Sequence, residues 1–524
     1  MTELDNRNIL AWGSENQEKL SRLRVAVVGS GPLAQLIIAS LAGLGVGYSE
    51  NGGAIINIDN NRINNREIDF LCEQTTDTIN KEKVKQFKKV VTQIKPYCNY
   101  IPLFTDFCTA DLYRFESEII IEATNDPVSK EKALNYSMVY RIPFLSGSAD
   151  QTKGAAASYF GKEKPDLEKL VLPQFRGRLQ EGYTSSVVAG LILEELRKHT
   201  FRYSDRSGKS LSADRNLSDN EIIYYNSHSI SRNSFRDDFS RKKLDLKNKK
   251  ILVVGSGALG NFLGISLGYL GIGKIDFLDF DTVESHNLSR QILLYGKVGE
   301  KKCLTLAERV NKMNSSSKTS AFYGKVGKIN LDEDKDWLRE LYETEKEQWK
   351  LKPKGRREET FPKTLLNFKN RHYSLSPAEK RDGLVLITKE WLSRQNYDLI
   401  LGGVDNKFAR LWINQAGRCC KLPYIDGGSG PKSGQLAVYI PGKTKCIDCQ
   451  LDLRHFPTRN SCIDGPEASV VMSNSLVAGM MVGEAVNLFE GNIKKRDNLT
   501  LRYQVLNQKR ILVDNEKKLR DHYC

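Results

Sequence analysis

The sequence predicts an α/β fold built from two tandem, doubly wound domains. The first observation behind this prediction is an internal repeat: LRVAVVGSGPLAQLIIASLAGLGVG, which begins at Leu23, is echoed by KILVVGSGALGNFLGISLGYLGIG, which begins at Lys250. The second is that each copy consists of a short β-branched run, a glycine turn and apolar residues at helical spacing, which opens a doubly wound sheet. The glycine turns begin at Gly29 and Gly255, 226 residues apart, so each copy belongs to a unit of domain size.

The composition is that of a large globular protein. The chain has 524 residues, of which 40% are hydrophobic and 27% are charged, and this excludes a single small domain and wholesale disorder. Its start, MTELDNRNILAWGSENQEKL, lacks the basic and apolar stretches of a signal peptide. The most apolar window, residues 25–44, is interrupted by the sequence GSGP. We therefore expect a cytoplasmic protein without a membrane span.

The net charge of +15 makes an anionic partner plausible. However, the chain has no aromatic-flanked basic motif, no helix-turn-helix pattern and no zinc-finger spacing. A solvated basic surface is the simpler interpretation, and we do not expect a nucleic-acid partner.

Composition and the repeat together predict the domain organisation. The first domain is expected over residues 1–200 and the second over residues 220–524, joined by a polar linker at residues 201–219. A charged insertion at about 330–381 interrupts the second domain.

The second half carries a glycine turn followed by an acidic strand end. Gly255, Gly257 and Gly260 have the G-x-G-x-x-G spacing that lets a backbone turn approach a phosphate at the start of a helix. The next predicted strand ends at Asp279 and Asp281, where dinucleotide enzymes carry a ribose-binding acid. Taken alone, this pattern also fits a dinucleotide-dependent oxidoreductase.

Further polar groups follow the later strands and favour a triphosphate. Asn287 and Arg290 lie in DFDTVESHNLSRQ, Lys301 or Lys302 begins a predicted helix, and Asp405 and Asn406 end a predicted strand in YDLILGGVDN. A triphosphate with magnesium needs several cations and a carboxylate for the metal. Because the carboxyl ends of successive strands meet at one edge of the sheet, these residues predict a nucleoside triphosphate site.

At this point the sequence resembles a known superfamily. The runs GSGALG, DFDTVESHNLSRQ, VGEKKC, VDNKFAR and PYIDGGSGPKSGQLAVYIPGKTKCIDC resemble the ThiF/MoeB and ubiquitin-activating enzyme superfamily over nearly all of the second half except the insertion. The first half more weakly resembles the inactive adenylation repeat of two-repeat ubiquitin-activating enzymes. The resemblance implies two tandem Rossmann-like, ThiF-type adenylation domains, the first degenerate and the second active, in a single-chain pseudo-dimer.

The resemblance also implies a reaction and its residues. The reaction is adenylation of the C-terminal carboxylate of a ubiquitin-like protein by ATP and Mg²⁺, with release of pyrophosphate. Asp279 would bind the ribose, and Asp405 would organise the magnesium. Asn287, Arg290 and Lys302 would contact the phosphates.

Family members complete this site with an arginine from the partner repeat. Arg7, in DNRNI, fits that position, although the family's neighbouring Tyr and Gln are replaced here. The first half itself is expected to be inactive, because Ala34 replaces the third glycine, Asn125 stands in place of the aspartate and the NLSRQ run is missing. Its expected role is that of a scaffold.

Cys462, in an embedded segment at about 451–470, matches the family position of a reactive cysteine. Its thiolate would attack the adenylate to form a thioester, which would pass to a conjugating enzyme. Arg454, His455 and Arg459 could stabilise this thiolate, and a structural role for the thiol stays open. In contrast, Cys419 and Cys420 lie in an apolar helical pattern and are expected in the core.

Cys446 and Cys449 form a C-x-x-C pair, which in this family is half of a four-cysteine structural zinc site. The usual second pair is absent. Cys524 with His522, at the end of the sequence, could complete a zinc site, and a redox-active or vestigial pair is the alternative.

The compact two-repeat organisation is similar to activating enzymes of bacterial ubiquitin-like conjugation operons, including the antiphage Bil type. Two other functions stay open. One is a ThiF/MoeB-like sulfur-carrier or peptide adenylyltransferase without a thioester relay. The other is a non-catalytic adaptor that binds a ubiquitin-like protein.

Overall fold

The computed structural model describes residues 3–64, 68–71, 77–107, 110, 112–161, 182–202, 222–239, 244–327, 380–453, 468–495, 499–505 and 511–514. The predicted linker from residue 203 onward, nearly all of the predicted insertion and most of the embedded segment lie outside these described residues.

The first half forms a seven-stranded sheet with the order β3-β2-β1-β4-β5-β6-β7. Neighbouring strands pair in parallel from β3 to β5, whereas β6 and β7 run antiparallel. The β7 strand follows the predicted linker in sequence, yet it pairs with this first sheet. The strands are β1 (Arg24–Val28), β2 (Ala54–Ile58), β3 (Tyr100–Leu103), β4 (Ile119–Glu122), β5 (Phe144–Ala149), β6 (Lys153–Tyr159) and β7 (Ile222–Asn226).

The second half forms a nine-stranded sheet with the order β11-β10-β9-β8-β12-β13-β14-β15-β16. Its strands pair in parallel from β11 to β13, and the last three are antiparallel. The strands are β8 (Lys250–Val254), β9 (Lys274–Asp279), β10 (Lys318–Val326), β11 (Val385–Ile387), β12 (Leu399–Gly402), β13 (Tyr424–Ser429), β14 (Ser433–Tyr439), β15 (Thr500–Gln504) and β16 (Ile511–Asp514).

Both sheets reverse their strand order beside the first strand of the repeat. That strand is β1 in the first sheet, between β2 and β4, and β8 in the second, between β9 and β12. In open α/β sheets, ligands bind at the carboxyl ends of the strands at this reversal. The prediction of two tandem Rossmann-like domains is therefore confirmed, and the second sheet places its reversal at the glycine turn of GSGALG.

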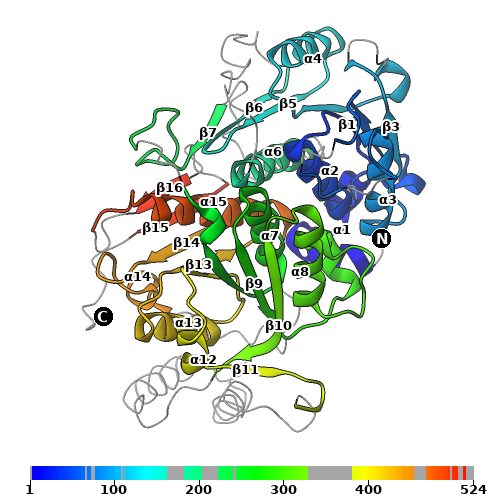
Figure 1. Ribbon diagram of the computed structural model, residues 1–524. Helices are drawn as coiled ribbons and strands as arrows, with labels where there is room; N and C mark the ends of the chain where they lie inside the picture. Colours follow the sequence, from blue (N-terminus) through cyan, green and yellow to red (C-terminus); the bar gives the residue numbers. More distant parts are fainter. Residues whose placement is uncertain are drawn as a thin grey trace, which may run out of the picture.

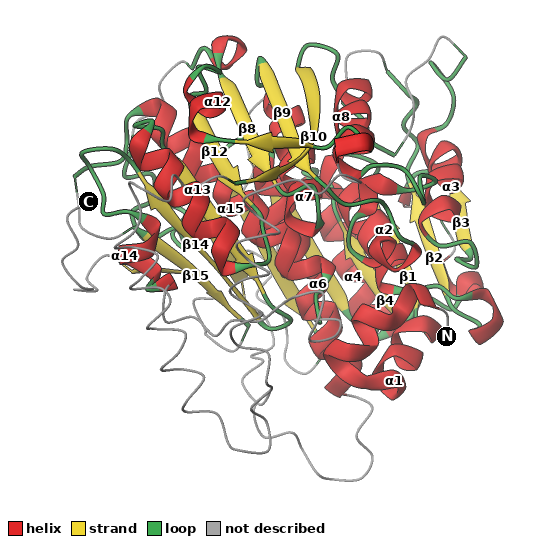
Figure 2. Cartoon of the chain, turned by 90° about the horizontal axis from the view of Figure 1, so that it is seen from below, coloured by secondary structure: helices red, strands yellow, loops and turns green. Residues whose placement is uncertain are grey.

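Helices cover the two sheets (Figures 1 and 2). In each repeat a glycine turn leads directly into a buried helix, α2 after β1 and α7 after β8, and both helices end at a left-handed glycine, as is common at helix C-termini. The helices are α1 (Asn6–Arg22), α2 (Pro32–Leu44), α3 (Lys83–Ile94), α4 (Pro127–Tyr140), α6 (Tyr183–Arg202), α7 (Ala258–Leu270), α8 (Lys302–Met313), α12 (Lys389–Ser393), α13 (Lys407–Cys419), α14 (Ile447–Leu451) and α15 (Val471–Glu490).

The two halves share one continuous apolar core. Helix α6 of the first half packs against α15 and α7 of the second, near the middle of the molecule (Figure 1). Glycines allow this close approach: a Cβ atom on Gly190 would lie 2.7 Å from the Met472 carbonyl oxygen, and one on Gly479 would lie 2.6 Å from that of Tyr183. The same buried cluster contains residues of α2 and α7. The halves are thus joined by a core rather than by a tether alone.

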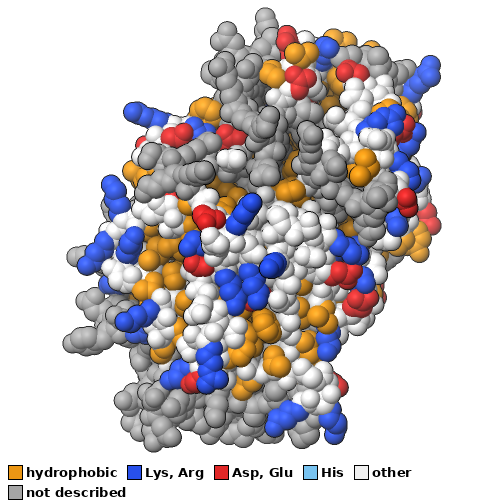
Figure 3. Space-filling model, viewed as in Figure 1, with side chains coloured by type: hydrophobic (Ala, Val, Ile, Leu, Met, Phe, Trp, Pro, Cys, Tyr) orange, Lys and Arg blue, Asp and Glu red, His pale blue; other side chains and the backbone are white. Residues whose placement is uncertain are grey.

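The surface drawn in Figure 3 carries Lys and Arg side chains over both halves, interspersed with acidic and apolar ones. They do not form one continuous basic stripe on this face. None of the helices in the described part of the chain combines the length and the hydropathy that crossing a membrane requires.

Candidate functional site

The glycine turn between β8 and α7 is tightly packed at two of its three glycines. Gly255 has φ +95°, and a Cβ atom there would lie 2.7 Å from the carbonyl oxygen of Gly403, just after β12. A Cβ atom on Gly260 would lie 2.2 Å from the carbonyl oxygen of Gly255. Gly257, at the N-cap of α7, is open: the nearest atom to an added Cβ is Gln291 Nε2, at 3.8 Å. The turn is compact, and its open position lies at the start of α7.

This difference in packing predicts that alanine substitutions at Gly260 and Gly257 lower the free energy of unfolding by different amounts. Gly260→Ala should lower the free energy of unfolding by about 1–3 kcal/mol, because its methyl group meets backbone that cannot move aside easily. Gly257→Ala should lower it by less than about 1 kcal/mol, because the space is free and the remaining cost is that alanine is a poorer N-cap than glycine. Denaturant unfolding of both variants measures this, and equal destabilisation would contradict the packing of the turn.

Asp279, at the end of β9, is held against the glycine turn. Its Oδ2 accepts a hydrogen bond from the Ser256 amide (2.6 Å), and its Oδ1 accepts one from the Asp281 amide (2.7 Å). Burial, and then the nearby Asp281 carboxylate, raises the pKa of Asp279 to about 6, although the Lys302 ammonium opposes this. A half-buried carboxylate in this position is suited to accept hydrogen bonds from ribose hydroxyls.

Lys302 lies beside these acids at the start of α8. Its side chain is only 8% exposed, and its Nζ is 2.8 Å from Oδ2 of Asp281, while its backbone amide donates to the Asp281 carbonyl (3.0 Å). The ammonium group therefore lies at the carboxyl end of β9, as the sequence predicts.

Asn287 and Arg290 come from a short 3-10 helix, Ser285–Ser289, and its C-cap. The Asn287 Oδ1 accepts from the Glu284 amide (3.0 Å), which closes a capping box, and its Nδ2 has no hydrogen-bond partner among the described residues. Arg290 is 8% exposed and donates through Nη1 to the His286 carbonyl (3.2 Å). No carboxylate of the described residues lies within ion-pair distance of Arg290.

Arg290 is thus a buried cation without a paired anion in the described part of the chain. Burial, and then the positive charge of Arg7, lowers its pKa to about 10, well below the usual range of a guanidinium. Such a cation is unfavourable in the isolated protein and favours an anionic ligand.

Arg7 reaches this site from the first half of the chain. It lies in the first turn of α1, and its Nη2 is 3.4 Å from Nε2 of His286, which is 279 residues away in the sequence. In the same region the Ser285 hydroxyl donates to Glu3 Oε2 (3.2 Å). The N-terminal segment therefore contacts the segment of the second half that carries Arg290.

Asp405 and Asn406 follow β12 and have different roles in the structure. Asn406 is the N-cap of α13, and its Oδ1 accepts from the Ala409 amide (2.8 Å). The exposed Asp405 takes no part in this cap, and its Oδ1 accepts a long hydrogen bond from Asn406 Nδ2 (3.4 Å). Arg410 fixes the loop behind them, because it donates to the Val404 carbonyl and pairs with the buried Asp426 (2.7 Å). Apart from this long contact with Asn406, the Asp405 carboxylate has no hydrogen-bond or ion-pair partner in the described part of the chain.

The interior of the site contains polar atoms without partners. The Ser256 hydroxyl and the Gln291 Oε1 are both buried and lack a hydrogen-bond partner among the described residues. Buried polar atoms are normally paired, so these two fit a polar ligand lying between the glycine turn and the segment after Arg290.

The first half repeats the framework of this site with different groups. Asp59 comes directly after β2, much as Asp279 ends β9, and the Lys83 amide donates to the Asn61 carbonyl (3.1 Å) as the Lys302 amide does to that of Asp281. However, the Lys83 ammonium is only 3% exposed and pairs with the buried Asp69 (3.3 Å). Lys302 is also paired, but its partner Asp281 is about half exposed at the strand edge, whereas the partner of Lys83 is buried within the protein.

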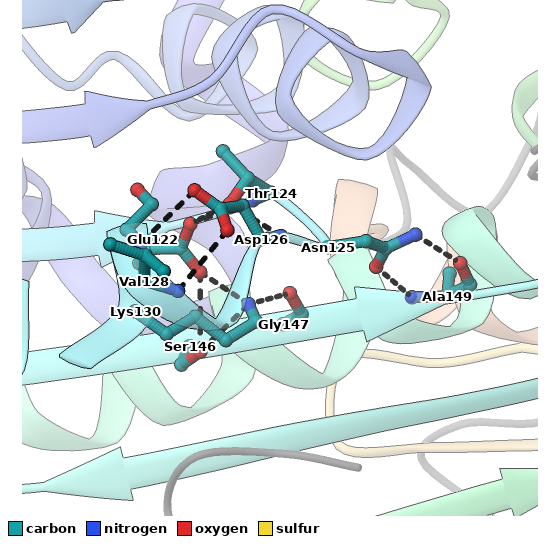
Figure 4. A network of polar contacts seen from close by, with 10 residues as sticks. Glu122, Thr124, Asn125, Asp126, Val128, Lys130, Ser146, Gly147 and Ala149 are labelled. Atoms are coloured by element: carbon teal, nitrogen blue, oxygen red, sulfur yellow. Dashed lines mark hydrogen bonds and ion pairs between the residues drawn. The ribbon is translucent and has the colours of Figure 1, made fainter. Parts of the chain in front are cut away.

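The strand end of β4 is closed in the same way (Figure 4). The amide of Asn125 exchanges hydrogen bonds with the backbone of Ala149 (2.8 and 3.2 Å), and Asp126 caps α4. Behind them a buried ion pair joins Lys130 and Glu122. Lys130 also donates to the carbonyl oxygen of Gly147 (2.7 Å), as Arg410 does to that of Gly427. The first half therefore keeps the fold of the site and uses its polar groups internally.

Some of the predicted cysteine sites lie within the described residues and others lie outside them. Cys446 and Cys449 are buried, and their sulfur atoms are 3.5 Å apart. Cys462, Cys524 and His522 lie outside the described residues, and within those residues no three Cys, His, Asp or Glu side chains converge on a metal position. The expectation that Cys419 lies in the core is wrong: it is exposed at the end of α13, whereas Cys420 is partly buried.

Sequence reasoning did not single out His286, Ser256 and Gln291. All three stand within or beside motifs that it did identify, GSGALG and SHNLSRQ, but their roles depend on which atoms lack partners or meet Arg7.

Comparison with known proteins identifies the fold family. A ThiF family model matches residues 5–218, 228–343 and 369–524. The chain belongs to the ThiF family. SUMO-activating enzyme subunit uba-2 of Caenorhabditis elegans is 26% identical over 200 residues, which are 38% of this chain and 25% of that protein. Adenylyltransferase and sulfurtransferase MOCS3 of Culex quinquefasciatus is 24% identical over 278 residues, which are 53% of this chain and 49% of that protein.

The crystal structure of E. coli MccB with MccA-N7isoASN aligns with 53% of this chain and 67% of its own chain, at 20% identity and a TM-score of 0.35. The ThiF-family chain described here spans about a quarter and about a half of the two curated relatives named above.

Proposed function

We propose that this ThiF-family protein uses ATP to adenylate the C-terminal carboxylate of a ubiquitin-like protein. The carboxylate oxygen would attack the α-phosphorus of ATP, the bond between that phosphorus and the bridging oxygen would break, and pyrophosphate would leave. The product is a mixed anhydride of the carboxylate and AMP. The second half would carry the reaction, and the first half would serve as a scaffold that supplies Arg7.

The observation that carries this proposal is the convergence of two cations, one from each half, on one strand edge. Arg290 is buried without a paired carboxylate among the described residues, and Arg7 lies close enough to depress its pKa. Two cations held together in this way are strongly stabilised by a polyanion such as a triphosphate. The closed first-half site argues that only one such site operates in the chain.

The other groups have complementary roles in this proposal. Asp279 would accept hydrogen bonds from the ribose, with Asp281 beside it, and Lys302 and Asn287 would contact phosphate oxygens. The Gly257 position would let the triphosphate approach the amides at the start of α7. Each group would stabilise charge that builds on the phosphates as pyrophosphate departs.

Magnesium fits Asp405 by its chemistry. A hard cation prefers carboxylate oxygens, and the Asp405 carboxylate is exposed and takes no part in capping α13. When bound with ATP, magnesium would neutralise phosphate charge, and Asp405 would be its protein ligand.

ATP–pyrophosphate exchange tests the proposal directly. Purified protein, ATP, Mg²⁺, labelled pyrophosphate and a ubiquitin-like protein with a free C-terminus should give exchange that depends on an intact C-terminal carboxylate. The ubiquitin-like protein with its last residue amidated is the matched control, because it has no C-terminal carboxylate to adenylate. Exchange that does not need the carboxylate would overturn the choice of substrate.

A thioester at Cys462 is the proposed second step. The thiolate would attack the acyl carbonyl, AMP would leave, and the thioester would pass to a conjugating enzyme. Non-reducing gels should then show an adduct that dithiothreitol removes and that Cys462→Ala lacks. Exchange without any adduct would instead favour an adenylyltransferase linked to sulfur transfer. The similarity to the adenylyltransferase and sulfurtransferase MOCS3 supports this alternative. Absence of both signals would favour the adaptor.

A structural zinc ion is proposed at Cys446 and Cys449. Two buried thiols 3.5 Å apart supply half of a tetrahedral site, and Cys524 and His522 would complete it. Metal analysis of the purified protein should give about one zinc per chain, and Cys446→Ser should lose it. A wild-type protein without zinc would favour the redox or vestigial pair.

The raised pKa of Asp279 predicts how nucleotide affinity depends on pH. Above about pH 6 the carboxylate is ionised and can accept from both the backbone amides and the ribose, and below it protonation removes an acceptor. Affinity for ATP should therefore fall as pH decreases through about 6. Because phosphate groups also take up protons in this range, Asp279→Asn is the control, and calorimetric titration should show a shallower pH dependence for it.

A further inference from the structure

Arg7 and His286 are joined in a contact that restricts the chemical state of the histidine. The two nitrogens, Arg7 Nη2 and His286 Nε2, are 3.4 Å apart. A guanidinium has only hydrogen-bond donors, so Nε2 must be the acceptor and cannot carry a proton. The ring proton must then be on Nδ1, which is 3.1 Å from Glu284 Oε2. The contact requires a neutral imidazole in one tautomer, with Glu284 accepting from it.

The backbone of His286 is fixed by its surroundings. Its carbonyl oxygen accepts from Ser289 Oγ (3.0 Å) and from Arg290 Nη1 (3.2 Å), and the Glu284–Asn287 capping box holds the 3-10 helix that contains it. His286 thus meets Arg290 through its carbonyl and Arg7 through its ring. One residue connects the two cations that the proposed triphosphate would need.

Arg7, in contrast, has a rigid base and a long side chain. The residue two positions before it, Asp5, is buried and pairs with the buried Lys95, which fixes the start of α1. A long arginine side chain loses conformational freedom when it is ordered, so its guanidinium needs partners to stay in one place. Among the described residues, the partner from the second half's SHNLSRQ segment is His286.

We propose that His286 is a positioning residue: its neutral imidazole, oriented by Glu284, holds the guanidinium of Arg7 next to Arg290 and the phosphate site. This inference rests on the proposed function for its catalytic consequence. The contact itself does not depend on that function.

The charges around His286 favour its neutral form. Burial lowers the pKa of the imidazole below its ordinary value, the positive charge of Arg7 lowers it further, and Glu284 opposes them. The charged groups that face the ring come from α1, from α8 and from its own segment: Arg7, Lys302, Arg290 and Glu284. Protonation at acidic pH would remove the acceptor and place a third positive charge beside the two arginines. The adenylation rate should therefore show an acid limb that reports on His286.

Kinetics of His286 variants test the positioning role. His286→Leu removes the acceptor and should lower kcat for ATP–pyrophosphate exchange about tenfold with little change in the KM for ATP. His286→Gln supplies an amide oxygen near the place of Nε2 and should recover most of that loss. At saturating ATP, where the effect of Asp279 on affinity does not limit the rate, kcat of this variant should lack the acid limb. If the acid limb is unchanged in His286→Gln, the inference is overturned.

A double-mutant cycle separates action through Arg7 from any other effect. In an Arg7→Ala background, His286→Leu should cause no further loss, because the group that it positions is already gone. Arg22→Ala, which removes an exposed arginine of the same helix α1, is the matched control and should behave as wild type in the cycle. Losses that multiply would show that His286 does not act through Arg7.

Histidine titration by NMR tests the contact without any activity. The chain has six histidines, so selective labelling with His286→Gln as the assignment control resolves this one. Its pKa should rise in Arg7→Ala and fall in Glu284→Gln. If the pKa stays the same in both variants, the contact is overturned. A protein without exchange activity whose His286 still responds to Arg7→Ala would overturn the proposed function and support the contact.

Discussion

Asp405→Ala is expected to lower the rate of ATP–pyrophosphate exchange about a thousandfold while leaving the protein as stable as wild type. The rate should fall because the exposed carboxylate at the end of β12 is the proposed ligand of magnesium. Stability should hold because the cap of α13 is supplied by Asn406 and not by Asp405. Steady-state exchange and thermal unfolding measure the two quantities on the same preparation.

Two controls make the Asp405 result specific. Glu308→Ala removes an exposed carboxylate of α8 that pairs with Lys312, and it should change the exchange rate by less than about twofold. Asn406→Ala removes the cap and should lower the free energy of unfolding by about 1 kcal/mol. A fully active Asp405→Ala protein would rule out the proposed metal ligand.

Arg290→Met is expected to reduce exchange at least about a hundredfold and, in the absence of nucleotide, to stabilise the protein. Burial and Arg7 hold the pKa of Arg290 at about 10, so the charged side chain is disfavoured in the folded protein at neutral pH. A cation whose pKa is lower in the folded than in the unfolded state destabilises the folded state at every pH at which the cation is protonated, so removing it should raise the free energy of unfolding. Methionine keeps much of the volume without the charge, and the expected gain is about 1–3 kcal/mol.

Added ATP should reverse the order of the melting temperatures of the wild type and Arg290→Met. The triphosphate should raise the melting temperature of the wild type far more than that of Arg290→Met, because only the wild type gains a paired buried cation. Lys312→Met, which removes an exposed cation of α8, serves as the control and should gain no stability. A destabilised Arg290→Met protein would contradict the view of Arg290 as an unpaired buried charge.

The fold was predictable because its signals are local. The glycine turns at Gly29 and Gly255 lie between an apolar strand and an apolar helix, and that pattern repeats at domain size. The sequence singles out Asp279, Arg290, Lys302 and Asp405 as site candidates for a related reason: each follows or lies near a strand end, and parallel strands bring their carboxyl ends together.

The remaining features depend on contacts that the sequence does not encode locally. The contact of Arg7 with His286 joins residues 279 positions apart. Asp405 and Asn406 are neighbours in VDN, and only the geometry of α13 shows that the amide is the cap. The closure of the first half was partly predicted from Asn125, but the ion pair of Lys83 with Asp69 lies in a segment without sequence similarity to NLSRQ.

The glycine-mediated packing of α6 on α15 has a consequence for how the site responds to dilution. Enzymes that borrow an arginine from a second subunit lose it when the subunits separate, so their specific activity falls at low concentration. Here the half that carries Arg7 and the half that carries the proposed site belong to one covalent chain with a common core. The effective concentration of Arg7 at the site therefore does not depend on the protein concentration. Its activity per mole should stay constant over nanomolar to micromolar dilution.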